Sequence, residues 1–214
     1  MDNNGELRDT ILEALQGAGE ACTTLSGFIL QAANHLRSGE IREGNELLAE
    51  VLRDFAQLAS LLEDVRRDLI STADALVAKG NQDVYGRPLA GIYYWGCNGT
   101  VARQTLILQA ANKVSPNPDY LNTALDAVGH LFGRNYYGRS YVTGLGHQPP
   151  LNPHDRRSGA DDIEEPWPGY LVGGGESATG WHDVEEDYRT NEIAINWQAA
   201  LVYSLAGFIS AQSR

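Results

Sequence analysis

"EGNELLAEVLRDFAQLASLLEDVRRDLISTADALVAKG", residues 43–80, is an unbroken run of helix-forming residues whose apolar side chains recur every seven positions. Two ladders run through it: Leu48, Phe55, Leu62, Leu69 and Leu76 form the first, and Val51, Leu58 and Val65 form the second. A seven-residue repeat keeps both ladders on one side of a helix and is typical of a seam between paired helices. The stretch therefore predicts a long helix from Glu43 to about Lys79, ended by Gly80 and in need of a partner.

The preceding segment, from Leu7 to Leu36, has the same pattern. Its ladders are Ile11, Ala18, Leu25 and Ala32, and Leu15, Cys22, Ile29 and Leu36. Ser38-Gly39 is a turn signal, so the two helices are expected to fold back as an antiparallel hairpin. We assign residues 1–68 to this hairpin, for which no family is recognised, and residues 69–214 to a second domain. The boundary falls inside the second helix.

Beyond Gly80 the composition changes, because glycine, proline, tyrosine and tryptophan become frequent. Helices are predicted near residues 99–112, 118–132 and 191–209, which makes the fold class all-α. Asn117-Pro118 is a strong helix start, with a capping side chain followed by proline in the first turn. Nearly sixty residues without regular structure separate Gly133 from Thr190, and loops of this length in a compact domain usually carry function.

Composition excludes several function classes. The 214 residues include 28 acidic and 16 basic side chains, for a net charge of −12, so a nucleic-acid partner is not expected. No apolar run approaches the length of a membrane span, and no membrane partner is expected. The start, "MDNNGELRDT", has no signal peptide and predicts a cytoplasmic product. Cys22 and Cys97 are interpreted as separate small apolar residues rather than a disulfide.

The segment "NPHDRRSGADDIEEPWPGYLVGG", residues 152–174, gathers charge in a stretch that cannot form a long helix. Its His154 and Arg156, with nearby aromatic rings, suit a neutral polyhydroxy ligand, since sugars offer hydroxyl groups and apolar faces. The alternative is a solvated loop in which arginine and aspartate pair at the surface with little energetic effect. The residues of this segment leave both interpretations open.

A second segment, "WHDVEEDYRTNEIAINWQAALVYSLAGF", covers residues 181–208. Thr190 or Asn191 is a candidate cap for the last helix, which would place Glu192 in its first turn. An ordinary capping glutamate is one interpretation of Glu192. With Asp183 it also forms a pair of acids, and paired carboxyl groups of unequal pKa are the groups that cleave glycosidic bonds.

These residues resemble glycoside hydrolase family 9, the inverting cellulases. "RSYVTGLGHQPPLNPHDR" and "WHDVEEDYRTNEIAINWQA" are similar to the two active-site signatures of that family, in the same order and at a matching spacing. "YGRPLAGIYYWGCNGTVARQTLILQAANK" and "ALDAVGHLFGRNYYGRSYVTG" resemble the segments that precede them in bacterial endoglucanases. The similarity covers about residues 69–214 and corresponds to the last third of a catalytic domain.

The resemblance implies an (α/α)6 barrel of paired helices, here incomplete, whose open end holds a groove for a β-1,4-glucan or cellulose chain. Glu192 matches the catalytic acid, and Asp183 matches the second acid of the same signature. His154 and Arg156 match the substrate-binding pair, and His154 is counted among the catalytic residues as well. Trp167, Tyr136 and Tyr137 are candidate sugar platforms, with buried support as the alternative role. No cofactor is required, but Asp161 matches a segment that holds structural calcium in some relatives.

The chain also departs from the family pattern. Gln148 and Gln198 stand where the signatures usually have other polar residues, and each is expected to shift a supporting hydrogen bond without removing it. The family's catalytic base comes from an Asp-Ala-Gly-Asp motif that this sequence does not contain. The family is also usually secreted, unlike the cytoplasmic product that the start predicts.

Three functions remain open from the sequence. The chain is a cellulase-type enzyme with little or no activity alone, a glucan-binding remnant, or a helical assembly or fusion module. In the third case the hairpin pairs two copies of the chain or binds a partner chain.

Overall fold

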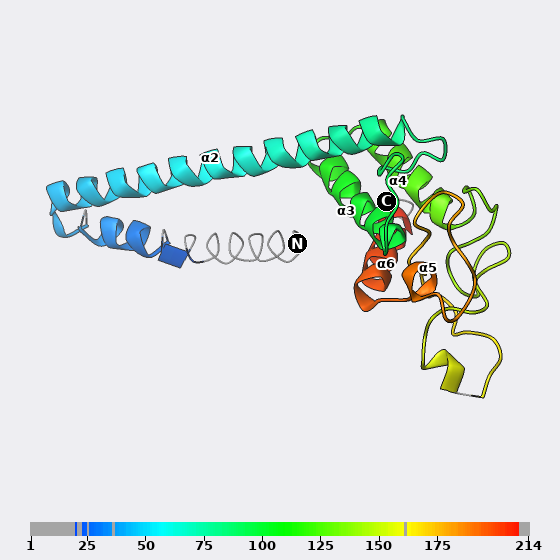
Figure 1. Ribbon diagram of the computed structural model, residues 1–214. Coiled ribbons are helices and arrows are strands. Elements are labelled where there is room, and N and C mark those ends of the chain that lie inside the picture. Colours follow the sequence, from blue (N-terminus) through cyan, green and yellow to red (C-terminus); the bar gives the residue numbers. More distant parts are fainter. Residues whose placement is uncertain (1–19, 21–22, 25, 36, 161, 210–214) are drawn as a thin grey trace. The chain divides into compact units, whose positions relative to one another are not determined.

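The computed structural model describes residues 20, 23–24, 26–35, 37–160 and 162–209. Its elements are α2 (Ile41–Gly80), α3 (Cys97–Val114), α4 (Pro118–Leu131), the short 3-10 helix η1 (Ser158–Ala160), α5 (Tyr188–Asn191) and α6 (Ile195–Ile209) (Figure 1). In the described residues, extended segments pair only through isolated bridges rather than through strands. The predicted all-α class is confirmed.

The chain forms two compact units, residues 1–67 and 68–214, and the boundary between them falls within α2. In the first unit, the chain turns at Gly39, whose φ of +84° is readily adopted only by glycine. Ala32 and Val51 of the predicted seam are buried, whereas Phe55 and Leu62 are exposed. Pairing of two copies through this unit stays a prediction.

In the second unit, α3 lies between α4 and α6 (Figure 1). The last turns of α2 contribute to one of its two cores, where Ala73 and Leu76 pack with Leu108, Ala111, Tyr120 and Ala124. The Tyr120 hydroxyl also donates to Asp74 at 2.6 Å. The predicted start of α4 is confirmed, because the Asn117 side chain accepts a hydrogen bond from the Asp119 amide and Pro118 is the first helical residue.

The other core surrounds the ring of Trp197, which is only 4% exposed. Glycines make room for this ring. A Cβ atom on Gly99 would lie 2.1 Å from Trp197 Cδ1, and one on Gly96 would lie 2.5 Å from Cζ2. Because Gly96 and Gly99 open α3 while Trp197 belongs to α6, this packing sets how closely the two helices approach.

A buried arginine shapes the segment that leads from α2 to α3. Arg87 has no exposed surface and donates from Nη2 to the carbonyl oxygens of Ala90 and Ile92, while its Nε lies 3.4 Å from Asp83 Oδ2. Burial, together with the Arg87 cation nearby, lowers the pKa of His130 to about 3. His130 therefore stays neutral in the folded protein at neutral pH.

The long irregular region predicted between α4 and the last helix is present from Phe132 onward (Figure 1). Backbone bridges tie it to itself and to the segment before α6: Val142 pairs with Leu171, and Val172 pairs with Ile193. The Gln198 side chain adds a further tie, since it accepts from the Leu171 amide at 2.7 Å and donates to the Leu171 carbonyl at 2.9 Å. The longer amide at this position thus makes two supporting hydrogen bonds.

None of the helices in the described part of the chain has the length and apolar character of a membrane span.

Gly99→Ala tests the fit of Trp197 between α3 and α6. Alanine normally stabilises a helix by up to about 1 kcal/mol relative to glycine, but the added methyl group here overlaps a ring that has no room to move. We expect a net loss of about 1–3 kcal/mol in the free energy of unfolding, measured by urea denaturation. Gly91→Ala is the control, because nothing lies within 4 Å of the position that its Cβ atom would take. Equal stability of the two variants would contradict this packing.

Candidate active site

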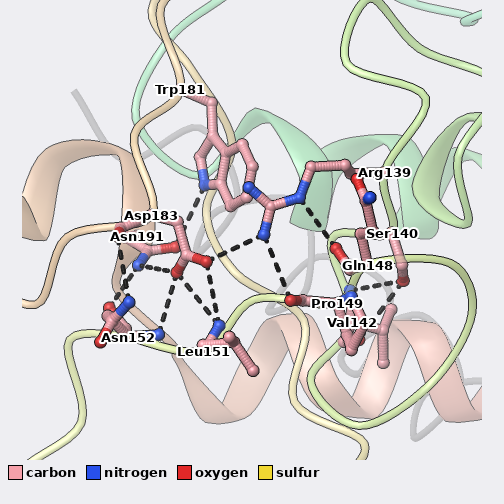
Figure 2. Close-up of polar contacts among 10 residues, drawn as sticks. All are labelled: Arg139, Ser140, Val142, Gln148, Pro149, Leu151, Asn152, Trp181, Asp183 and Asn191. Atoms are coloured by element: carbon pink, nitrogen blue, oxygen red, sulfur yellow. Dashed lines mark hydrogen bonds and ion pairs between the residues drawn. The ribbon is translucent and has the colours of Figure 1, made fainter.

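The carboxylate of Asp183 joins the two signature segments (Figure 2). It accepts hydrogen bonds from the backbone amides of Leu151 and Asn152, with closest distances of 3.0 and 2.9 Å. Arg139 Nη2 donates to it at 3.0 Å and Asn191 Nδ2 at 3.3 Å. The side chain is 12% exposed, so this charge is largely removed from water and depends on these donors. The carboxylate of Asp183 thus ties these donors together, and its predicted catalytic role stays a prediction.

Arg139 also holds the first segment in place (Figure 2). Besides Asp183, it donates from Nε to the carbonyl oxygen of Gln148 at 2.9 Å and from Nη2 to that of Pro149 at 3.3 Å. Its guanidinium carbon also lies 5.0 Å from the centre of the Trp181 ring. At Gln148, therefore, the backbone carbonyl makes the supporting contact, and the residue has a left-handed φ of +44°.

Glu192 lies in an extended segment and not in the first turn of the last helix, so the prediction of a helical position was wrong. Its φ and ψ are −69° and 153°, and α6 begins only at Ile195. Thr190 and Asn191 consequently do not cap that helix. The Asn191 side chain instead bonds to Trp181, Asn152 and Asp183.

The segment around Glu192 is paired with backbone on both sides. His154 and Glu192 form a parallel bridge, in which the His154 amide donates to the Asn191 carbonyl at 2.9 Å. On the other side, the Gly173 amide donates to the Glu192 carbonyl at 2.9 Å. Adjacent extended segments lie about 4.8 Å apart, so the two predicted residues stand next to each other at the point where the two signatures meet.

The Glu192 carboxyl group has one identified partner. Trp95 Nε1 donates to Glu192 Oε2 at 3.0 Å, and the Trp95 ring makes an edge contact with Trp197 at a centroid distance of 5.4 Å. Within the described residues, the other oxygen, Oε1, makes no hydrogen bond. One oxygen is thus anchored while the other is free to exchange a proton with a ligand.

The His154 ring is oriented by the second signature segment. Its Nδ1 lies 2.6 Å from the carbonyl oxygen of Glu185. A carbonyl oxygen can only accept, so Nδ1 carries the proton, and Nε2 of the neutral ring is left as an acceptor. His154 can therefore receive a hydrogen bond from a hydroxyl group.

Paired charge in the loop after His154 has a structural role. Asp155 accepts from Arg157 Nε at 3.1 Å and from the Ser158 hydroxyl at 3.0 Å. Burial acts to raise the pKa of Asp155, but these hydrogen bonds outweigh it and leave the pKa below its ordinary value. Arg156 is exposed and forms no hydrogen bond or ion pair with the described residues, which leaves its guanidinium group available to a ligand.

The three candidate sugar platforms lie in different environments. Trp167 is 42% exposed and stacks on Tyr170 at a centroid distance of 6.3 Å. Tyr136 is 59% exposed. Tyr137 is less exposed, and its hydroxyl both donates to the Trp181 carbonyl and accepts from the Trp181 amide, so it supports the second signature segment. Desolvation raises the pKa of Tyr137, which keeps this hydroxyl protonated.

The predicted calcium ligand, Asp161, lies outside the described residues. Among the residues that are described, no three histidine, cysteine, aspartate or glutamate side chains converge as a metal site. A calcium site at Asp161 stays a prediction.

Sequence reasoning missed Trp95, Arg139 and Asn191 as members of the site. Trp95 and Arg139 both lie in segments that resemble the family, but neither had an assigned role. Trp95 bonds to Glu192, 97 residues away in the chain, and Arg139 bonds to Asp183, 44 residues away. Patterns within a short stretch of sequence do not reveal contacts over such separations. For Trp95, the signal available in the sequence was a tryptophan directly before Gly96, at the start of α3.

Comparison with known proteins identifies the family of this chain. The family model "Glycosyl hydrolase family 9" matches residues 23–205 and so reaches back into the hairpin, beyond the similarity recognised from the motifs. Endoglucanase D of Acetivibrio thermocellus is 63% identical over 155 residues, or 72% of this chain. A xyloglucan-specific endo-β-1,4-glucanase of Bacteroides ovatus is 35% identical over 171 residues, or 70% of this chain.

Solved structures show the same relationship. A family 9 structure from Bacteroides ovatus matches 73% of this chain with a TM-score of 0.65 and 34% identity. The chain spans only part of these relatives: about 25% of Endoglucanase D, 28% of the xyloglucan-specific enzyme and 30% of the solved structure. The extent of the family match and the level of identity lead to one conclusion: this chain belongs to glycosyl hydrolase family 9.

Proposed function

We propose that this chain carries the general acid and sugar-binding residues of a site that cleaves β-1,4-glucan. The observation that supports this most strongly is the backbone bridge between His154 and Glu192, which places an imidazole-bearing residue and a carboxyl-bearing residue from the two signature segments next to each other. The names of the relatives, endoglucanase and xyloglucan-specific endo-β-1,4-glucanase, agree with a substrate of this class.

In the proposed reaction, Glu192 is the general acid. The carboxyl group gives its proton to the glycosidic oxygen as the bond between that oxygen and the anomeric carbon breaks. Water adds to the anomeric carbon from the opposite face and gives up a proton to a base, so the sugar inverts its configuration. The hydrogen bond from Trp95 to Oε2 holds the carboxyl group so that Oε1 faces the leaving oxygen.

His154 and Arg156 are the proposed sugar-binding residues. The Nε2 atom of His154 accepts from a sugar hydroxyl because Nδ1 is committed to the Glu185 carbonyl. Arg156 is exposed and supplies donors to hydroxyl oxygens from a position two residues further along the same loop. Asp183 does not act on the substrate in this proposal, since its oxygens are already bonded to protein donors.

The base is the missing component. The sequence has no Asp-Ala-Gly-Asp motif, which the resemblance identifies as the source of the catalytic base. General base catalysis is worth about a hundred- to ten-thousandfold in rate, so hydrolysis by the chain alone is expected to be slow. The absence of this motif also favours a second function, in which the chain binds glucan without cleaving it.

His154→Ala tests the sugar-binding role. Loss of one neutral hydrogen bond costs about 0.5–1.5 kcal/mol, so affinity for cellohexaose should fall roughly two- to tenfold in isothermal titration calorimetry. His147→Ala is the control, because His147 is an exposed histidine of the first signature segment whose side chain makes no hydrogen bond among the described residues. Unchanged affinity in the His154 variant would exclude its contact with sugar.

Glu192→Gln tests the acid. Glutamine keeps the acceptor for Trp95 but has no proton to give to a leaving oxygen, so any release of reducing sugar from carboxymethylcellulose should fall to background. Cellohexaose affinity should stay within about threefold, as the change removes no more than a fraction of a hydrogen bond. Glu186→Gln, in an exposed residue of the same segment, is the matched control. If Glu192→Gln still hydrolyses carboxymethylcellulose as fast as the Glu186→Gln control, another group is the acid.

A further inference from the structure

The Asp187 carboxylate joins the two ends of the loop that leads to Glu192. Its Oδ2 atom accepts from the Thr190 hydroxyl at 2.9 Å and lies 3.1 Å from His182 Nδ1. A carboxylate only accepts, so His182 Nδ1 carries a proton and donates it to this contact. The His182 amide in turn donates to Thr190 Oγ1 at 3.3 Å. These residues, here called the Asp187 network (Asp187, His182 and Thr190), therefore close residues 182–190 into a loop.

The Asp187 network differs from a helix cap and from an exposed ion pair. Asp187 stands at the N-cap position of α5, but its side chain makes no capping hydrogen bond there. The Asp187 side chain is only 18% exposed and Thr190 only 3%, so much of the network is removed from water. Without Asp187, the buried Thr190 hydroxyl would lose the acceptor for its proton, and an unpaired buried donor is costly.

Asp187 is ionised at neutral pH. Burial acts to raise its pKa, but the hydrogen bonds from His182 and Thr190 outweigh burial and hold the pKa below its ordinary value. Arg189 adds to this effect, with its Nε atom 3.9 Å from Asp187 Oδ1. Hydrogen bonds to an ionised acceptor are stronger than those between neutral groups. The loop is therefore closed by charge-assisted contacts.

The loop closed by the Asp187 network carries two groups that contact the His154 ring. The Glu185 carbonyl oxygen lies 2.6 Å from His154 Nδ1. The ring of Tyr188, the residue after Asp187, lies at a centroid distance of 6.3 Å from the imidazole. Among the described residues, no hydrogen bond or ion pair joins Asp187 to His154 directly. Asp187 can thus act on His154 only through the loop that it closes.

We propose that Asp187 is a positioning residue for the sugar-binding histidine. By closing the loop, it holds the Glu185 carbonyl against His154 Nδ1. This contact keeps the proton on Nδ1 and leaves Nε2 as the acceptor for a sugar hydroxyl. His182 and Thr190 serve the same role through Asp187. The contact with sugar rests on the function proposed above, whereas the control of the His154 tautomer does not.

The tautomer of His154 in Asp187→Ala tests this role without any sugar. The measurement is made on the full 214-residue chain, labelled with ¹⁵N at histidine, at about pH 8, where histidine is neutral. The imidazole ¹⁵N shifts of the wild type should show mainly the Nδ1–H form, and His154→Ala identifies the signal. In Asp187→Ala we expect the tautomer ratio to move about two- to tenfold toward the Nε2–H form, the range that one hydrogen bond contributes.

Three further variants separate positioning from a general effect on the fold. Glu186→Ala is the matched control, because it removes an exposed acid next to Asp187, and it should keep the wild-type tautomer. Asp187→Asn should restore most of the Nδ1–H form, since its amide oxygen still accepts from His182 and Thr190. His182→Ala removes a side chain that is 64% exposed, so the fold should tolerate it. It should shift the tautomer in the same direction as Asp187→Ala, and it decides the question if that variant does not fold.

Cellohexaose affinity, measured by isothermal titration calorimetry, connects the network to the sugar site. Asp187→Ala should lower the affinity about two- to tenfold in the wild-type background. In the His154→Ala background the same change should have no effect, because Asp187 acts through His154. A general loss of loop structure would instead lower the affinity in both backgrounds.

A wild-type tautomer of His154 in both Asp187→Ala and His182→Ala would overturn the positioning role. A further loss of affinity on adding Asp187→Ala to His154→Ala would overturn it as well. An altered tautomer together with unchanged or absent cellohexaose binding would count against the proposed function and leave the positioning role supported.

Discussion

The candidate site depends on the burial of one negative charge. Asp183 is largely removed from water, and the burial of its carboxylate is costly unless N–H groups replace the lost solvent. Those groups come from three separate parts of the chain, at Arg139, at Leu151 and Asn152, and at Asn191. These hydrogen bonds to the Asp183 carboxylate can form only when the irregular loop lies against the segment that precedes α6.

This constraint explains how a site forms from segments that lie outside the helices. Once Leu151 and Asn152 are held, His154 follows two residues later and pairs with the extended segment at Glu192. The other edge of that segment is paired with Gly173, and Trp197 packs closely against α3 just beyond it. Glu192, His154 and Trp95 are thus placed by hydrogen-bonded and packed neighbours, although all three lie outside the helices. Loops that carry function are usually supported in this way by a fixed scaffold.

Local patterns in the sequence predicted the helical class, the start of α4 at Asn117-Pro118 and the long irregular region. Each of these depends on interactions within a few residues, which spacing and capping chemistry reveal. The start of the last helix was misplaced, because Thr190 and Asn191 look like capping residues but their side chains bond to Asp187 and to more distant groups. The motifs located Glu192, His154 and Asp183, whereas the link between them through Arg139 and Trp95 required the folded chain. Exposure of Phe55 and Leu62 likewise could not be predicted from a heptad pattern, since a repeat indicates a partner without identifying it.

Amide hydrogen exchange in Asp183→Asn measures directly whether this carboxylate holds the two segments together. Asparagine has a single acceptor oxygen and turns an N–H group toward the donors at Leu151 and Asn152. We predict that the amides of these two residues exchange at least about tenfold faster than in the wild type, which corresponds to about 1.4 kcal/mol in the free energy of local opening. Amides within α3 should be protected as before, and Asp126→Asn, which removes only an exposed ion pair with Arg134, should leave the loop unchanged. Wild-type exchange at Leu151 and Asn152 in the Asp183 variant would show that the loop is held by something other than this charge.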